Sequence, residues 1–206
     1  MRLPRLLLTL AMAAVVVLPL RLAAAAETPA ATVETLHQAL LAVMREAAEL
    51  SVEDRYARLA PTLTAAYDFQ TMTRLAVGTA WTEASADQRA ALTGAFGRLS
   101  IATYAKRFSG YSGQRFETVG EKPGPRGTTL VETRLVRPAD PPVPLTYVLQ
   151  KQDGGFRIID VILEGAISEL AVRRSEYAQV LRQGGVDALT RLLDGKADEM
   201  LRGSGG

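Results

Sequence analysis

The stretch from residue 156 to residue 181 changes its pattern of hydrophobic and polar positions once. From Phe156 to Leu163 it is a β-branched and aliphatic run interrupted only by Arg157 and Asp160, which is too apolar for a strand with one face in water. After Gly165 the apolar residues recur at the three-and-four spacing of one helical face. The pattern predicts a central strand followed by a helix that folds over it.

Beyond residue 109 the hydrophobic pattern has period two, and four segments separated by Pro- and Gly-rich clusters are expected to be strands. They are residues 115–121, 128–137, 143–151 and 156–163. The connections are short, and short connections favour an antiparallel meander. Asp153-Gly154-Gly155 is a tight-turn signal between the last two strands.

Amphipathic stretches with capping residues predict helices on either side of these strands. We expect a helix over residues 33–47 capped by Thr32, and a short helix from Ser51 with Pro61 at its exit or at the start of the next turn. A helix between Asp68 and Gly78, a long helix from Ala86 to about Phe108 capped by Ser85, and a short helix over residues 186–193 after Gly184-Gly185 are expected as well. Helices followed by strands and a closing helix indicate an α+β fold. We expect a curved antiparallel sheet of about four strands covered by helices, with an apolar pocket between sheet and helices.

The N-terminus has the three parts of a secretory signal peptide. A short basic segment precedes a continuous apolar run from Leu6 to Leu18, and Ala23 to Ala26 offers the small residues that a signal peptidase needs. The run is short for a membrane anchor, which needs roughly 20 residues, and Pro19 and Arg21 close it. We therefore expect a signal peptide over residues 1–26, one α+β domain over 27–196, a flexible tail over 197–206, and a mature protein outside the cytoplasm.

Composition narrows the chemistry that the domain can carry. The chain has no Cys, which excludes disulfides, thiolate metal sites and cysteine nucleophiles. Its one His, His37, lies on an apolar helical stripe and is interpreted as a hydrogen-bonded core residue. Three of the 24 basic residues belong to residues 1–26, which leaves 21 against 22 acidic ones, so nucleic-acid binding has no electrostatic support. No metal site and no cofactor are predicted.

Several segments in a fixed order carry a family resemblance. They are the signal peptide, Asp68-Phe69 leading to Val77-Gly78 and Trp81, an aromatic helix ending in Tyr104, Leu145-Thr146-Tyr147, and Ile159-Asp160-Val161 through Glu164-Gly165 to Arg174-Ser175-Glu176-Tyr177. Together they resemble the MlaC, or toluene-tolerance, family of periplasmic lipid carriers, over residues 32–196. The segment ISELAVR, residues 167–173, departs from the usual family pattern and looks more like the hopanoid-associated HpnM branch.

The resemblance implies a periplasmic protein that buries the apolar part of one lipid between sheet and helices and shuttles it between membranes. Its partners would be an outer-membrane lipoprotein complex and an inner-membrane transporter complex. The cargo would be a phospholipid for the family at large, or a hopanoid for the HpnM branch. Such a carrier is not an enzyme, and it needs no cofactor.

The candidate lipid-binding residues are aliphatic and aromatic, because a lipid tail needs a dry, deformable cavity. They are Phe69, Met72, Leu75, Trp81, Phe96, Leu99, Tyr104, Leu145, Tyr147, Ile159, Val161 and Leu163, with Ile167 and Leu170 on the lid helix. Each position also fits plain core packing, and only their collective excess points to a pocket. Arg174 falls on the apolar stripe of the last helix, and we expect it to form a structural ion pair with Asp160, with Glu164 as the other candidate partner.

Two other classes of function remain open at this stage. A cone-shaped α+β fold can host acid–base catalysis, for which Asp160, Glu164 and Tyr147 would be the residues, although no nucleophile–base pair, metal cluster or phosphate loop is present. A module that only docks to a membrane transporter would differ from a carrier in having no cavity. The presence of a cavity and of a lipid in the purified protein separates the three hypotheses.

Overall fold

The computed structural model describes residues 28–152 and 154–202, so the predicted signal peptide lies outside the described residues. The elements in chain order are α1 (Pro29–Arg45), α2 (Val52–Ala66), α3 (Phe69–Val77), α4 (Ala80–Glu83), α5 (Ala86–Arg107), β1 (Arg115–Pro123), the 3-10 turn η1 (Pro125–Gly127), β2 (Thr129–Arg137), β3 (Asp140–Gln152), β4 (Gly155–Leu163), β5 (Ile167–Ser168) and α6 (Glu169–Leu201). Within the described part of the chain, no helix has the length and apolar character that crossing a bilayer requires.

The strands form one antiparallel sheet with the order β1-β2-β3-β4-β5, which is the predicted meander with one more strand than expected. The extra strand is β5, which pairs with β4 through Ile162 and Ser168. Glu164 and Gly165 both have positive φ angles, 52° and 76°, and turn the chain back along β4. Because two residues pair with β4 before the helix begins, the prediction that Ile167 is helical is wrong.

Local capping signals decide most helix boundaries. Ser51 and Ser85 each form the predicted capping box, with Asp54 and Gln88 respectively. The first helix begins earlier than predicted, because the Thr28 hydroxyl accepts a hydrogen bond from the Ala31 amide and Pro29 occupies the first helical turn. The hydroxyl of Thr32, the predicted cap, instead donates to the Phe156 carbonyl across the fold.

Pro61 lies inside α2, although the sequence predicted the helix to end near it. A proline in a helix interior leaves one carbonyl without its usual donor. Here the helix continues for five residues beyond Pro61, and its two buried leucines, Leu59 and Leu63, lie on either side of that position. We infer that burial of this apolar face outweighs the lost hydrogen bond.

The last helix is longer than predicted. α6 bends at Gly185, where φ is 66° and ψ is −165°, which agrees with the predicted break. It then continues to Leu201 rather than ending at residue 193, and Ala197 is fully buried against the core. Residues 197–201, expected in a flexible tail, are therefore helical, because their apolar positions pack on the body of the protein.

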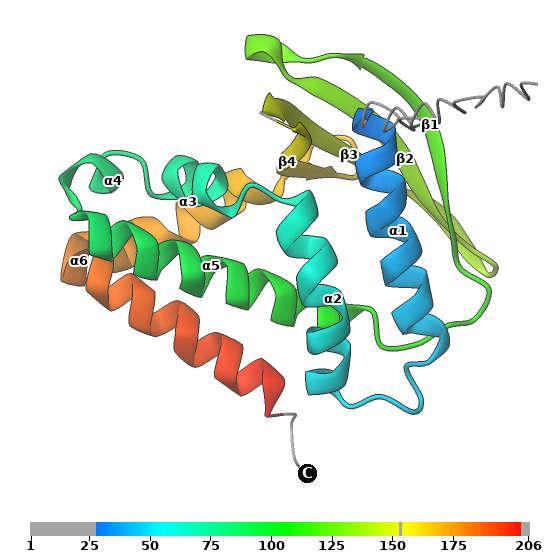
Figure 1. Ribbon diagram of the computed structural model, residues 1–206, viewed down its shortest axis with the longest axis horizontal. Helices are drawn as coiled ribbons and strands as arrows, with labels where there is room; N and C mark the ends of the chain where they lie inside the picture. Colours follow the sequence, from blue (N-terminus) through cyan, green and yellow to red (C-terminus); the bar gives the residue numbers. More distant parts are fainter. Residues whose placement is uncertain (1–27, 153, 203–206) are drawn as a thin grey trace, which may run out of the picture.

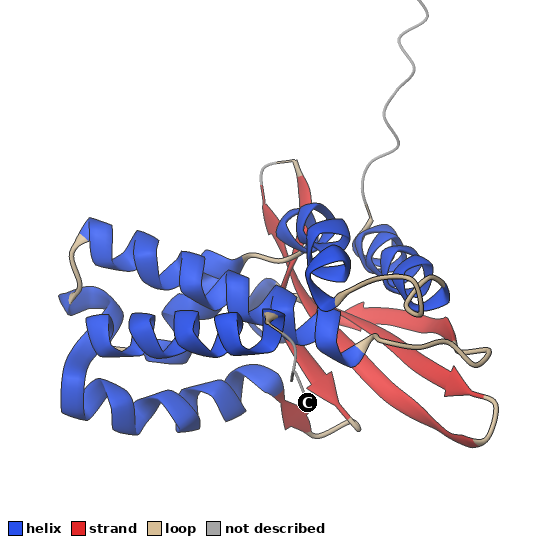
Figure 2. Ribbon diagram, turned by 90° about the horizontal axis from the view of Figure 1, so that it is seen from below, coloured by secondary structure: helices blue, strands red, loops and turns tan. Residues whose placement is uncertain are grey.

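The sheet curves around α1, and the other helices gather at one side of the strands (Figures 1 and 2). α5 and the second half of α6 lie side by side, with α2 beside α5 and α3 beside the first half of α6. Side chains alternate between the two faces of each strand, so Val131, Tyr147 and Leu149 enter the core while Leu130 and Val148 lie on the opposite face. The predicted α+β fold with helices over a curved antiparallel sheet is confirmed.

Candidate functional site

A cavity of about 300 Å³ lies between the inner face of the sheet and three helices, and we call it the inner cavity. The sheet contributes Leu135, Leu145, Tyr147, Val161 and Leu163. The helical side of its lining consists of residues from α3, from α5 and from the first turns of α6, together with Tyr67 and Phe108, which directly follow α2 and α5. The predicted pocket between sheet and helices is therefore present.

The start of α3 is held against the sheet, which fixes one wall of the inner cavity. The Asp68 carboxylate caps α3 by accepting from the Thr71 amide at 2.9 Å, and the Asp68 amide donates to the carbonyl of Ile158 in β4 at 2.9 Å. Phe69 follows directly, and its ring packs against Gly97 of α5, where a Cβ would come within 3.1 Å of it. The cap that the sequence predicted for Asp68 thus positions an aromatic wall of the cavity.

The polar groups in the cavity wall already have partners within the protein. The Ser100 and Thr103 hydroxyls donate to the carbonyls one turn back in α5, at 2.8 Å each. The hydroxyls of Tyr67 and Tyr104 hydrogen-bond to each other. Since these groups need nothing from a ligand, the wall as a whole offers an apolar surface.

Three tyrosines in this wall stay neutral over the physiological pH range. Burial raises the pKa of Tyr104 to about 12, and it raises the pKa values of Tyr67 and Tyr147 well above their ordinary range. The Tyr147 hydroxyl lies 3.0 Å from Nε2 of His37, whose ring stacks on Phe116 at a centroid distance of 3.9 Å. His37 is therefore a buried, hydrogen-bonded core residue, as predicted, and burial lowers its pKa to about 3.

The mouth of the cavity carries charge. Arg107 at the end of α5, together with Glu169 and Arg173 in the first turns of α6, lines it. Arg107 lies 3.5 Å from Glu169, and its side chain is 62% exposed. Arg173 in turn lies 4.0 Å from Glu176, so each guanidinium group at this rim has a carboxylate beside it, next to a largely apolar lining.

Nine of the fourteen candidate residues line the inner cavity. They are Phe69, Met72, Phe96, Tyr104, Leu145, Tyr147, Val161, Leu163 and Leu170. They come from α3, α5, β3, β4 and α6, segments that the chain separates by up to about a hundred residues. The structure therefore brings together residues that the sequence could only group by chemical type.

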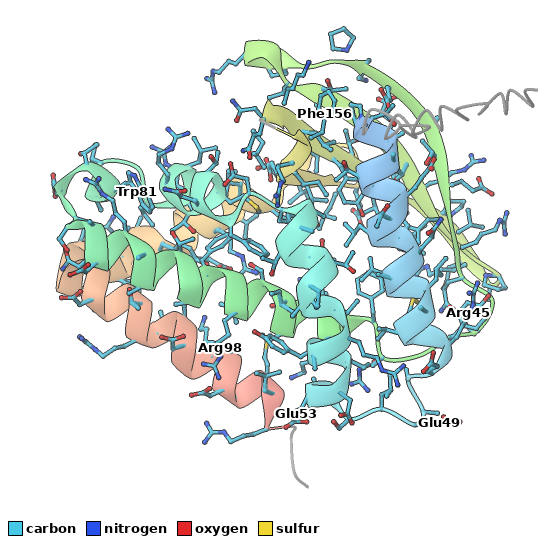
Figure 3. All side chains as sticks on the ribbon, in the orientation of Figure 1. Arg45, Glu49, Glu53, Trp81, Arg98 and Phe156 are labelled. Atoms are coloured by element: carbon cyan, nitrogen blue, oxygen red, sulfur yellow. The ribbon has the colours of Figure 1, made fainter. Side chains whose placement is uncertain are left out.

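The other five candidates lie elsewhere. Leu75 and Ile159 line a different hollow, on the outer face of the sheet, and Leu99 is packed in the core. Trp81 lies in α4, at the end of the helical layer away from the strands (Figure 3), with its carbonyl bonded by Arg89. Ile167 is 47% exposed in β5. Periodicity identifies buried positions but does not say which of them border an empty space.

Eight further residues of the lining were not among the predicted candidates. They are Tyr67, Ser100, Thr103, Arg107, Phe108, Leu135, Glu169 and Arg173. Tyr67 and Phe108 are aromatic residues at helix ends, and Leu135 belonged to an alternating strand, so an apolar search could have included them. The polar residues carried no signal, because only tertiary packing shows that they rim a cavity.

The predicted ion pair between Arg174 and Asp160 does not form. Among the ion pairs of residues 28–152 and 154–202, none joins these two side chains. The Asp160 carboxylate instead accepts from the Ser168 hydroxyl at 2.6 Å and from the Leu170 amide at 3.0 Å. It ties the start of α6 to β4, so the link between helix and sheet exists but uses uncharged donors.

The residues proposed for an enzyme do not share one site. Tyr147 lines the inner cavity, whereas Asp160 lines the hollow on the outer face of the sheet. Glu164, the third candidate, is exposed in the turn between β4 and β5. No group of three or more His, Cys, Asp or Glu side chains in the described part of the chain is placed to hold a metal ion.

Comparison with known proteins gives the family. Residues 34–194, which are 161 of the 206 residues, match the family described as MlaC protein. The chain belongs to the MlaC family. This member of the MlaC family also resembles a solved structure, the phospholipid-binding protein from Ralstonia solanacearum in complex with a phospholipid. The two share 22% sequence identity with a TM-score of 0.73, and the match covers 85% of this chain and 99% of the other, so the fold is shared.

Proposed function

We propose that this MlaC-family protein is a lipid carrier whose inner cavity holds the apolar part of one lipid, with the headgroup at the charged mouth. The observation that carries the proposal is the combination of an apolar wall, in which the hydroxyls are already paired, with a rim that contains Arg107 and Arg173. Transfer of hydrocarbon from water to such a surface is favourable by roughly 25 cal/mol per Å².

The volume of the inner cavity is at the lower end of the range for small-molecule sites, which begins at roughly 300 Å³. Met72 and Leu170 are unbranched or γ-branched side chains in its wall, and such side chains change rotamer easily. We infer that the cavity enlarges when a lipid enters, while the sheet and the α5 wall stay in place.

A phospholipid fits the rim better than a neutral polycyclic lipid does. Guanidinium groups form strong, often bidentate hydrogen bonds with phosphate, and Arg107 and Arg173 both stand at the mouth. The phospholipid in the related Ralstonia structure supports the same cargo class. The hopanoid of the HpnM branch, which the sequence suggested, is the alternative cargo.

The wider role is part of the proposal as well. The N-terminal sequence has the pattern of a secretory signal peptide, which supports a periplasmic location. In that compartment we propose that the protein shuttles lipid between an outer-membrane lipoprotein complex and an inner-membrane transporter complex. A lipid whose tails are covered and whose headgroup stays at an open mouth can be handed over without crossing water in exposed form.

The proposal is tested by mass spectrometry of lipid extracted from protein purified without detergent. We expect about one phospholipid per chain, and a hopanoid in its place would change the cargo but not the carrier role. Protein that is empty, and that takes up no lipid from vesicles, would contradict the proposal.

Two neighbouring residues of β4 provide a matched pair of variants. Leu163→Trp adds a bulky side chain within the inner cavity and should remove most of the bound lipid. Ile162→Trp places the same side chain on the outer face of the same strand, so it should leave the lipid in place. If both variants retain lipid equally, the lipid does not occupy the inner cavity.

A further inference from the structure

A second hollow, of about 610 Å³, lies on the outer face of the sheet, and we call it the outer groove. Its floor is apolar and includes Leu130, Val148 and Ile162 of β2, β3 and β4, which face away from the inner cavity. Its walls come from α3, from the first turns of α6 and from the η1 turn. α3 and the start of α6 thus contribute residues to both hollows, whereas η1 contributes to the outer groove and not to the inner cavity.

Three arginines line the outer groove, one from each wall: Arg74 in α3, Arg126 in η1 and Arg174 in α6. None of the ion pairs formed by the described residues involves any of them. The Arg174 guanidinium lies close to the C-terminal end of α3, because its Nη2 atom is 3.6 Å from the position that a Cβ on Gly78 would take. The last turn of α3 contains Arg74. Like charges gathered around one hollow repel each other unless an anion lies between them.

The backbone at Arg126 supports a role in binding. Arg126 has φ 55° and ψ 33°, a left-handed conformation that is uncommon for a residue other than Gly, Asn or Asp. Such a conformation costs of order 1 kcal/mol, and residues that adopt it are concentrated at ligand sites. Here the strained turn holds a cationic side chain at the rim of an apolar hollow.

Asp160 is the one carboxylate among the described residues that line the outer groove, and it already has hydrogen-bond partners. Asp160 accepts hydrogen bonds from the Ser168 hydroxyl and from the amides of Val161 and Leu170. Leu170 belongs to the first turn of α6, where the helix dipole offsets negative charge. The three arginines therefore keep their positive excess toward a ligand.

We propose that the outer groove binds an anionic amphiphile, whose phosphate or carboxylate head lies among Arg74, Arg126 and Arg174 and whose apolar tail lies on the outer face of the sheet. The volume is within the range of small-molecule sites, roughly 300–1,000 Å³. A folded protein partner would need about 800 Å² of contact surface, more than one hollow of this size offers. Among the described residues, Leu170 alone lines both hollows, and the proposal does not depend on the proposed carrier function.

Dodecyl phosphate, below its critical micelle concentration, is the probe, and isothermal titration calorimetry of the full mature chain is the measurement. We expect dodecyl phosphate to bind, and inorganic phosphate and dodecyl maltoside to bind at least about tenfold more weakly, because each lacks one half of the recognised chemistry. If inorganic phosphate binds as tightly as dodecyl phosphate, the groove is a site for a free anion, and the proposal that it binds an amphiphile is wrong. Equal binding of dodecyl maltoside would overturn the role of the arginines.

Variants assign the binding to the outer groove. Arg74→Gln/Arg174→Gln should weaken dodecyl phosphate about tenfold or more, since charge-assisted hydrogen bonds are lost. The matched control, Arg182→Gln/Arg191→Gln, removes the same charge from two exposed positions of α6 outside both hollows and should have no effect. If binding is lost in Arg107→Gln/Arg173→Gln instead, dodecyl phosphate binds at the mouth of the inner cavity, and the proposal is wrong.

Ile162→Trp supplies an independent check, because it obstructs the floor of the outer groove without removing charge. It should abolish dodecyl phosphate binding in protein that still retains its copurified lipid. If the protein carries no lipid at all, the proposed carrier function is wrong. The effect of Arg74→Gln/Arg174→Gln on dodecyl phosphate binding still shows whether the outer groove is a binding site. Unchanged binding in Ile162→Trp would overturn the proposed position of the tail.

Discussion

The inner cavity and the outer groove lie on opposite faces of the same strands, but they differ in whether their polar side chains have partners within the protein. In β3, Tyr147 enters the inner cavity and is 2% exposed, while its neighbour Val148 lines the outer groove. The inner hydroxyls are paired within the protein, whereas the outer arginines form no ion pair among the described residues. One sheet can therefore offer two sites of different chemistry, because side chains alternate between its faces.

The largest expected effect is on the free energy of unfolding, and it separates the two faces of the sheet. Tyr147→Ala removes a buried aromatic ring and leaves His37 without its hydrogen-bond partner, so the free energy of unfolding should fall by about 3–5 kcal/mol. Val148→Ala, one residue further along β3, should cost only about 1 kcal/mol, because the outer face is less closely packed. Urea denaturation measures both values. Equal losses would mean that the two faces are packed alike.

A second test uses pH, to which the inner side should respond through His37. Burial lowers the pKa of His37 to about 3, so the folded protein holds this side chain neutral while the unfolded chain protonates it below about pH 6.5. The unfolded state then binds more protons than the folded state, and stability falls as the pH is lowered through this window. Between pH 7.5 and pH 5.0 the contribution of His37 amounts to about 2 kcal/mol.

The control for the pH test is His37→Gln, which keeps a polar side chain but does not titrate. The wild-type protein should lose about 2 kcal/mol more than this variant between the two pH values, as measured by urea denaturation. Carboxylates contribute equally to both proteins, so the difference isolates the histidine. Parallel pH profiles would show that His37 is already solvated or protonated in the folded state.

The smallest expected effect is at the mouth of the inner cavity. Arg107→Gln/Arg173→Gln should slow the uptake of anionic phosphatidylglycerol from vesicles about twofold to fivefold, since the contact of an exposed charge such as Arg107 contributes less than about 1 kcal/mol. Uptake of zwitterionic phosphatidylcholine should change less. Adding 0.5 M salt should reduce the difference between the variant and the wild-type protein, because the screening length falls from about 10 Å at 0.1 M salt to about 3 Å at 1 M. An equal effect on both lipids would assign these arginines a structural role.

The sequence predicted the elements whose signals are local. Asp68 and Ser85 cap the helices that they were expected to cap, and the strands pair in the predicted meander. These features depend on residues within about four positions of one another, or on an alternation that any strand with one covered face shows. The placement of His37 in the core followed from the same kind of pattern.

The predictions that were wrong concern features that depend on contacts between residues far apart in the sequence. Pro61 remains in a helix because the leucines around it are buried, and residues 197–201 are helical because they pack on the core. Arg174 does not reach Asp160, since the carboxylate is already occupied by the Ser168 hydroxyl and backbone amides. None of these outcomes is visible in the neighbouring sequence.

The amino-acid sequence is enough to predict an apolar interior bounded by one meandering sheet and several capped helices, because periodicity and capping act over short distances. Tertiary packing places Leu145 and Leu163 at the border of a cavity and Leu99 in the filled core. It also decided that Leu75 and Ile159 belong to the opposite face, beside three arginines. A filled core and a lined cavity use the same residue types, and the difference between them lies in how the helices are spaced above the sheet.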